Sequence, residues 1–235
     1  MSVRGWLPVA LLAMKIDRQT TRDELIWVWL RSEWDGVEPP KPPDTTLIDS
    51  PDFTDQVQNQ AREELLYRHR EPILNGLPSN FDPLWADIEE TDLANLHILP
   101  SLEWYLDTGG TFRLVDTDAN LAHGRELRLG QIHYPFDHLT KIEDFTPRLV
   151  DYDAATTRQI LILIAADQAG PYVIIDGTHR AAALYRNYLT KPNMPWKVLL
   201  IVDRTIADST WYIESQIAKQ GIIQFKRYSA LGALR

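Results

Sequence analysis

The fold is decided by the stretch Tyr172–Ala183, which reads YVIIDGTHRAAA. The apolar run 172–175 is typical of a buried strand, and the pair Asp176-Gly177 forms a tight turn that ends it. Residues 178–189 then resume as a helix, and three consecutive alanines near its start permit close contact with a sheet. A strand that passes through a tight turn directly into a helix is typical of an α/β fold.

Helix and strand patterns alternate on both sides of this corner. Upstream, residues 154–168 carry apolar side chains at helical spacing after two acidic capping candidates, and Gly170 ends that predicted helix. Downstream, residues 196–202 predict a second apolar strand and residues 209–219 a final helix. The segment Thr108–Thr111 is either a hairpin turn or a helix stop before a strand. We therefore expect an α/β (α+β) fold with a small mixed sheet and the corner at one strand end.

In the first part of the chain the sequence predicts helices and a proline-rich spacer. Residues 21–24 have the spacing of a capping box, and the apolar positions that follow predict an amphipathic helix over residues 22–34. The proline cluster 39–43 lacks backbone donors and predicts an extended spacer or loop. The segment 50–52 supplies an N-cap, a first-turn proline and an acid, so a second helix is predicted over residues 51–70.

Composition limits the function classes. The chain has 235 residues, a net charge of −9 and no cysteine, which excludes disulfides, thiolate metal sites and cysteine nucleophiles. Residues 1–100 hold 9 Lys and Arg against 18 Asp and Glu, whereas residues 101–235 hold 15 of each. We therefore divide the chain into a mainly helical N-terminal region, 1–100, and a second region, 101–235. The sequence provides no broad basic surface, so a nucleic-acid partner is not expected. The acidic first region is instead a candidate contact surface for a protein partner.

The same composition predicts a cytoplasmic protein without a membrane partner. No uncharged segment reaches the roughly 18–20 apolar residues that a spanning helix needs. The N-terminal apolar run 6–14 is followed by no small-residue cleavage pattern, which argues against a secretory signal.

The corner itself predicts an anion site. Unpaired backbone amides at a helix start carry partial positive charge, and Gly177 allows a ligand to come close to those of Thr178 and the next residues. His179 and Arg180 add donors where phosphate oxygens would lie. Asp176 would repel a phosphate unless it binds a magnesium ion or handles a proton. The alternative is that Asp176 only caps the helix and that His179 and Arg180 are solvated surface residues.

The stretch 173–183, VIIDGTHRAAA, resembles the signature of the ParB/sulfiredoxin superfamily, whose members show a strand, a D-G-x-H-R-like turn and an alanine-rich helix. The resemblance covers roughly residues 125–205, with its specific part in the centre. In that superfamily the corner binds nucleotide phosphates: sulfiredoxins use ATP, ADP-dependent free serine kinases phosphorylate an amino acid, and ParB proteins bind CTP and clamp DNA. The resemblance therefore implies a nucleotide-binding domain of this type, with the phosphates held at Gly177, Thr178, His179 and Arg180.

Departures from the pattern narrow the implied activity. Thr178 stands where sulfiredoxins carry their reactive cysteine, so their sulfinic acid chemistry is lost. About fifty-five residues remain after Arg180, too few for the helix-turn-helix and basic region of ParB. The motif is closest to that of the serine kinases, whose first histidine is replaced here by Thr178. The expected function is a nucleotide-dependent phosphotransferase, using ATP or ADP with Mg²⁺ and acting on a small hydroxyl-bearing substrate.

Such a kinase needs alignment, positive charge and a base. Asp176 is predicted to hold the metal or take the proton, and His179 to assist the reaction. Related kinases use an acid from the upstream segment, for which Glu143 is the first candidate here and Glu126 the second, with Asp144 behind them. Two alternatives stay open: a nucleotide-sensing binding module with a protein partner, and a ParB-like enzyme acting on nucleic acid.

Two further histidines, His133 and His138, are candidate metal ligands by residue type. His133 and His138 flank Tyr134-Pro135-Phe136, a spacing that matches no helical pair of ligands. No metal site is expected there.

Overall fold

A six-stranded mixed sheet forms the centre of the protein in the computed structural model, which describes residues 14–36, 45–129, 131–149, 160–190 and 196–230. The strands lie in the order β1-β2-β8-β6-β7-β3. Their bounds are β1 Lys15–Gln19, β2 Leu84–Ile88, β3 Leu96–Ile98, β6 Leu161–Ala165, β7 Tyr172–Asp176 and β8 Trp196–Val202. A separate two-stranded sheet pairs β4 Arg125–Leu129 with β5 Ile132–Phe136. The mixed α/β class that the sequence predicts is confirmed.

The corner strand β7 lies inside the sheet. It pairs in parallel with β3 and antiparallel with β6, while β6 pairs in parallel with β8. Every residue of β6 and β7 is buried, because helices cover both faces of these strands and a continuous apolar run is what such a position requires. The helix predicted over 154–168 is therefore wrong at 161–165, where the chain is a strand; residues 154–159 lie outside the described ranges.

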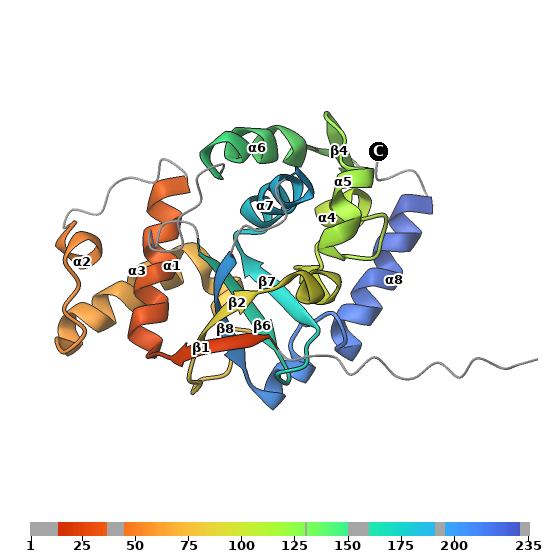
Figure 1. The fold of residues 1–235 in the computed structure, drawn as a ribbon. Helices are drawn as coiled ribbons and strands as arrows, with labels where there is room; N and C mark the ends of the chain where they lie inside the picture. Colours follow the sequence, from red (N-terminus) through yellow and green to blue (C-terminus); the bar gives the residue numbers. More distant parts are fainter. Residues whose placement is uncertain (1–13, 37–44, 130, 150–159, 191–195, 231–235) are drawn as a thin grey trace, which may run out of the picture.

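Helices surround the sheet on three sides (Figure 1). In that view α1, α2 and α3 lie to the left of the strands, α4, α5 and α8 to the right, and α6 and α7 above the end of β7. The α-helices are α1 Arg22–Gly36, α2 Thr46–Asp49, α3 Gln56–Leu74, α4 Leu102–Asp107, α5 Thr117–Asn120, α6 His138–Phe145, α7 Thr178–Thr190 and α8 Gln216–Ala230. Short 3-10 helices are η1 Glu90–Asn95, η2 Leu114–Asp116, η3 Thr146–Leu149 and η5 Arg204–Asp208.

The central sheet takes strands from both sides of residue 100. The strands β1, β2 and β3 belong to the first region and β6, β7 and β8 to the second, and one hydrophobic core includes residues from both. The first region is therefore an extension of the same core, and it supplies half of the strands as well as helices. No helix among the described residues has the length and apolar character needed to cross a membrane.

Helix starts differ from prediction where several caps compete. The helices predicted at 22–34 and 178–189 are confirmed, and the strands at 172–175 and 196–202 as well. The second helix begins at Gln56 instead of residue 51, because the Asp55 carboxylate accepts from the amides of Val57 and Gln58. The last helix begins at Gln216 instead of residue 209, and Ser215 Oγ accepts from the amide of Ala218 at 3.0 Å.

Two further predictions concern the segments 108–111 and 39–43. The helix α4 ends at Asp107, so 108–111 is a helix stop, but only an isolated bridge between His97 and Arg113 follows it. The proline cluster 39–43 lies outside the described residues.

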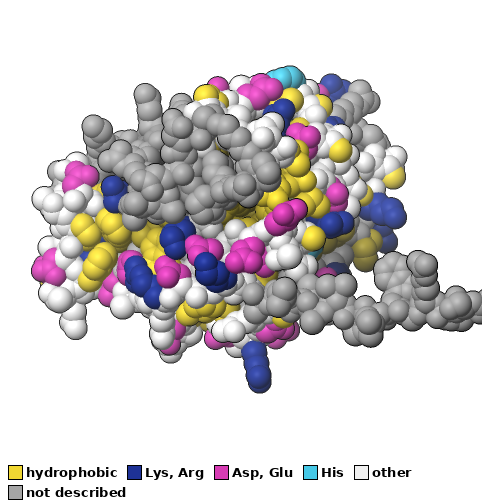
Figure 2. Space-filling model, in the orientation of Figure 1, with side chains coloured by type: hydrophobic (Ala, Val, Ile, Leu, Met, Phe, Trp, Pro, Cys, Tyr) yellow, Lys and Arg dark blue, Asp and Glu magenta, His cyan; other side chains and the backbone are white. Residues whose placement is uncertain are grey.

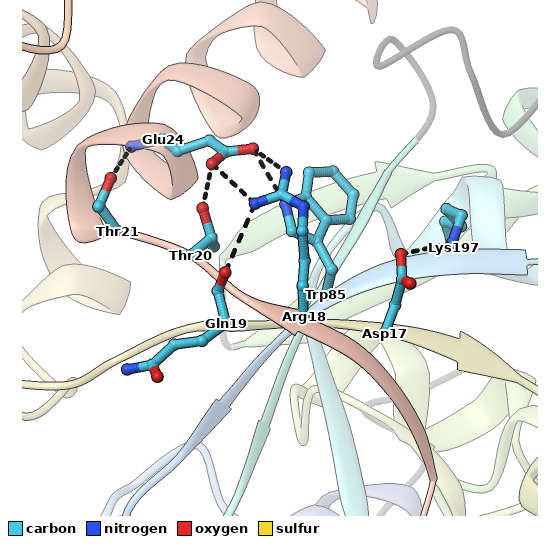
Figure 3. A network of polar contacts seen from close by, with 8 residues as sticks. All are labelled: Asp17, Arg18, Gln19, Thr20, Thr21, Glu24, Trp85 and Lys197. Carbon is cyan, nitrogen blue, oxygen red and sulfur yellow. Dashed lines mark hydrogen bonds and ion pairs between the residues drawn. The ribbon is translucent and has the colours of Figure 1, made fainter.

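Charged side chains tie the edge of the sheet together. Figure 2 shows acidic and basic side chains interspersed on one face of the molecule, with no broad basic area in the part of that face that is described. At the junction of β1 and α1, Glu24 accepts from Arg18 at 2.6 Å, from the Trp85 indole at 3.0 Å and from Thr20 (Figure 3). Burial alone would raise the pKa of Glu24, but these donors outweigh it and the pKa is lowered.

Candidate functional site

A glycine makes the corner between β7 and α7 possible. Gly177 has φ +81°, a conformation that residues with a side chain rarely adopt. A Cβ at this position would lie 2.8 Å from Leu161 Cδ2 and 2.9 Å from Arg180 Nη2. The first hydrogen bond of the helix runs from the amide of Ala181 to the carbonyl of Gly177 at 2.8 Å. The amides of residues 178–180 have no such partner among the described residues, so they are free to bind an anion.

The corner opens into a pocket of about 520 Å³. This volume lies within the ≈ 300–1,000 Å³ that small-molecule sites occupy. Five helices contribute to its wall: α1, α3, α4, α6 and α7. The lining consists of Ser32, Glu33, Arg70, Ile73, Leu99, Ser101, Glu103, Trp104, Lys141, Asp144, Phe145 and residues 175–180. The sequence-predicted residues Asp176, Gly177, Thr178, His179 and Arg180 are therefore all brought to one pocket.

Arg180 and Asp176 face each other. Arg180 Nη2 donates to Asp176 Oδ2 at 2.6 Å and to Ser32 Oγ at 2.9 Å, and Ser32 Oγ donates to the same carboxylate oxygen at 3.1 Å. All three side chains are buried. Burial by itself would raise the pKa of Asp176, but the positive charges of Arg180 and Arg70 outweigh it and lower the pKa. Arg180 thus neutralises Asp176, and this arrangement does not favour the predicted role of Arg180 as a phosphate clamp.

The predicted magnesium site on Asp176 does not fit this arrangement. One oxygen of its carboxylate is taken by Arg180 and Ser32, and the other lies 3.5 Å from Arg70 Nη2. A cation placed there would meet two guanidinium groups. The part of the chain that the structure describes also contains no cluster of three His, Asp or Glu side chains arranged for a metal.

Glu33 is an acid of the pocket whose pKa is raised. It lies near the end of α1, and Arg70 Nε donates to its Oε1 at 2.7 Å. The side chain is 15% exposed. Burial, and then repulsion from Asp176, raise the pKa of Glu33 to about 7 despite the charge of Arg70. A carboxyl group with a pKa near neutrality can both take up and release a proton, as a general acid or base must.

Arg70 reaches Glu33 from a break in α3. Its φ of −130° and ψ of 22° are not helical, and Pro72 lies inside the helix two residues later. A proline ring clashes with the carbonyl four residues before it and supplies no amide hydrogen, so it bends the helix at this point. The Arg70 side chain is 35% exposed and lines the pocket while it holds both carboxylates.

His179 is present as a neutral imidazole. It packs against Trp104, with ring centroids 5.2 Å apart, and edge-on against His138 at 4.9 Å. Burial, and then the charges of His138 and Lys141, lower the pKa of His179 to about 3. Its Nε2 atom is buried and lacks a hydrogen-bond partner within the described structure. His179 can therefore hydrogen-bond to a ligand, but it brings no positive charge.

Lys141 supplies positive charge at the rim. It lies on α6, is exposed, and has no ion pair with any residue that the structure describes. Glu103 and Asp144 line the same pocket. The pocket wall therefore carries both positive and negative side chains. Among its cations, Lys141 is the one that is available to bind a ligand, because no described residue forms an ion pair with it.

The two upstream acids that the sequence favours lie elsewhere. Glu126 is on β4, where Arg128 donates to it at 2.5 Å and His133 lies 2.8 Å away. Glu143 is on α6 with a side chain 51% exposed, and its nearest recorded partner is His123 at 3.7 Å. Neither residue lines the pocket. The structure therefore gives no geometric support to their predicted roles as base.

Sequence reasoning missed three residues that line the pocket: Glu33, Arg70 and Lys141. Each lies on a helix of its own, far along the chain from the corner or from one another, and no motif marks them. The one signal available was Pro72, since a proline inside a helical pattern indicates a kink that often has a purpose.

Three comparisons with known proteins gave no match: no family model, no curated protein and no solved structure is similar to the chain. The resemblance to the ParB/sulfiredoxin superfamily therefore rests on the sequence, chiefly on residues 173–183, and stays a prediction.

Proposed function

We propose that the chain is a cytoplasmic, nucleotide-dependent phosphotransferase that acts on a small hydroxyl-bearing substrate, using ATP or ADP. The observation that carries this proposal is the pocket at the β7–α7 corner. It combines free amides at the start of α7, the cation Lys141, and the acid Glu33 with a pKa of about 7. Phosphoryl transfer needs this combination of alignment, positive charge and a proton acceptor.

Binding of the phosphates falls to the start of α7. The amides of Thr178, His179 and Arg180 would hold the phosphate oxygens, and Lys141, on the neighbouring helix α6, would add a positive charge. Arg180 contributes through its backbone, while its side chain keeps Asp176 in place. The corner is thereby built on a neutralised ion pair that does not repel an incoming anion.

Transfer itself requires a proton acceptor. A bond forms between the substrate hydroxyl oxygen and the terminal phosphorus, the bond from that phosphorus to the nucleotide oxygen breaks, and the hydroxyl proton leaves. Glu33 is the acceptor favoured by the geometry, because its carboxyl lines the pocket and ionises near neutral pH. Asp176 is a weaker base, since two arginines hold its pKa below the ordinary value.

The bound nucleotide would supply the phosphoryl group. Asp176, the carboxylate predicted to hold a magnesium ion, already has Arg180, Ser32 and Arg70 as partners, so it would not hold the metal during transfer.

Binding is tested with a thermal-shift and calorimetry panel of ATP, ADP, CTP and GTP, each with and without Mg²⁺. We expect at least one nucleotide to stabilise the protein and Lys141→Gln to weaken that binding. Lys226→Gln, an exposed lysine on α8, is the matched control. If no nucleotide binds to the wild type, the proposal is wrong.

Turnover is tested by following phosphate transfer to a library of small alcohols and amino alcohols. We expect Glu33→Gln to retain binding and lose transfer, while Glu126→Gln and Glu143→Gln behave like the wild type. These two variants also test the acids that sequence reasoning favoured. Saturable nucleotide binding without transfer to any acceptor would instead support the nucleotide-sensing module.

A further inference from the structure

His138 lies behind the pocket wall, in contact with residues that line the pocket. Its side chain is 5% exposed and occupies the first position of α6. Its Nδ1 lies 2.8 Å from Asp107 Oδ2, and its Nε2 lies 3.8 Å from Glu103 Oε2. The ring stacks on Trp104 with centroids 4.1 Å apart and meets His179 edge-on. His138 thus contacts three residues that line the pocket, Glu103, Trp104 and His179.

The charges around His138 come from four elements. Helix α4 contributes Glu103 and the buried Asp107, and β4 contributes Arg125, whose Nε lies 2.9 Å from Asp107 Oδ1. Helix α7 contributes His179, which is neutral, and α6 itself carries Lys141 one turn later. With His138 protonated, three cations, His138, Arg125 and Lys141, act on the two acids. When His138 loses its proton, one positive charge beside Glu103 is lost and this side of the pocket becomes more negative.

We propose that His138 determines whether the pocket accepts an anion, because its protonated ring neutralises Glu103 at the pocket wall. The inference rests on the proposed function, since it concerns the phosphate-binding pocket described there. His138 is a positioning and charge-compensating residue and does not itself touch the ligand. Its surroundings agree: burial would lower the pKa of His138, but Asp107 and Glu103 outweigh it and raise the pKa.

The sign of the effect follows from the raised pKa. The imidazolium is present below the pKa of His138 in the folded protein and is lost as pH rises through that value. Affinity for an anion should therefore fall as pH rises through the same range. A purely structural histidine would produce no such link between its own titration and ligand affinity.

The experiment measures the affinity for inorganic pyrophosphate by calorimetry, from one unit below to one unit above the His138 pKa found by NMR of its ring. We expect the dissociation constant of the wild type to rise by at least about fivefold across this range. In His138→Gln the rise should be smaller, because the contribution of His138 is absent while Glu33 and pyrophosphate itself still titrate, and binding should be weak throughout. In Glu103→Gln binding should be as tight as in the wild type or tighter, and the His138 pKa should fall.

The opposite effects of these two variants separate charge compensation from simple damage to the wall. His133→Gln, an exposed histidine on β5, is the matched control and should behave like the wild type. If both variants weaken binding equally, if His138→Gln keeps the full pH response, or if pyrophosphate does not bind to the wild type, the inference is wrong. Pyrophosphate binding that follows His138 without any nucleotide transfer would keep this inference and refute the proposed phosphotransferase.

Discussion

Replacing Arg180 with methionine should chiefly destabilise the fold. The guanidinium is 2.6 Å from Asp176, and the two side chains are 9% and 5% exposed. Removing one partner of a buried ion pair leaves the other charge unpaired, which costs about 3–5 kcal/mol. Arg70 Nη2 remains 3.5 Å from Asp176 and offsets part of this cost, so we expect about 3 kcal/mol. For a chain of this size that corresponds to a fall in melting temperature of about 6–12 °C.

The assay is urea unfolding of wild type, Arg180→Met, Asp176→Asn and the double variant. The double variant should lose less than the sum of the two single losses, by about 1–3 kcal/mol, because it leaves no unpaired charge. Arg186→Met is the control on the same helix, where a partly exposed pair with Asp118 at 3.2 Å should cost less than about 1 kcal/mol. If Arg180→Met unfolds like the wild type but no longer binds nucleotide, Arg180 is a ligand contact and our assignment of its side chain is refuted.

Three other changes test the site and the sheet edge. Gly177→Ala forces a side chain into a positive-φ corner against Leu161, so we expect about 1–3 kcal/mol lower stability by urea unfolding and weaker nucleotide binding by calorimetry; an unchanged protein would contradict the tight corner. Transfer by the wild type should rise with pH through about 7 as Glu33 loses its proton, and in Glu33→Gln it should be lower by about 10²–10⁴-fold and lose that rise. Glu24→Gln, which weakens the contact with Trp85, should cost about 1–3 kcal/mol at neutral pH. Because the pKa of Glu24 is lowered in the folded state, this difference should shrink in urea titrations as pH falls through that pKa, and a pH-independent difference would count against it.

Local signals explain which elements the sequence predicts correctly. The helix 22–34 was predictable because its capping box and its apolar spacing agree. The start of the next helix was not, because Ser50 and Asp55 both have the chemistry of an N-cap. Ser50 instead follows α2 as its C-cap residue, and Asp52, which was expected in the first turn, accepts from the amide of Thr54 at 2.8 Å. The run 160–165 was assigned to a helix because a short apolar segment carries no period of its own when both faces of it are buried.

The candidate site also contains residues that the local sequence predicts and residues that only the tertiary packing brings in. The corner 176–180 was predictable because its strand, its turn and its helix start are contiguous in the chain. Glu33 and Arg70 reach the corner only through the packing of α1 and α3 beside it, and no local pattern encodes that packing. The sequence therefore predicted that Arg180 binds phosphate, whereas in the structure the Arg180 guanidinium forms an ion pair with Asp176.

The distribution of charge decides which side chains can act on a ligand. Asp176 and Arg180 neutralise each other in the interior, and Arg70 is shared between Asp176 and Glu33. A proton on Glu33 weakens its hold on Arg70, and the guanidinium, which already lines the pocket, then becomes available to a phosphate. When Glu33 loses that proton, its carboxylate again holds Arg70, and the same carboxylate is then the base that transfer needs. Binding and transfer should therefore favour opposite sides of the same titration, and nucleotide affinity measured against pH should fall over the range in which the rate of transfer rises.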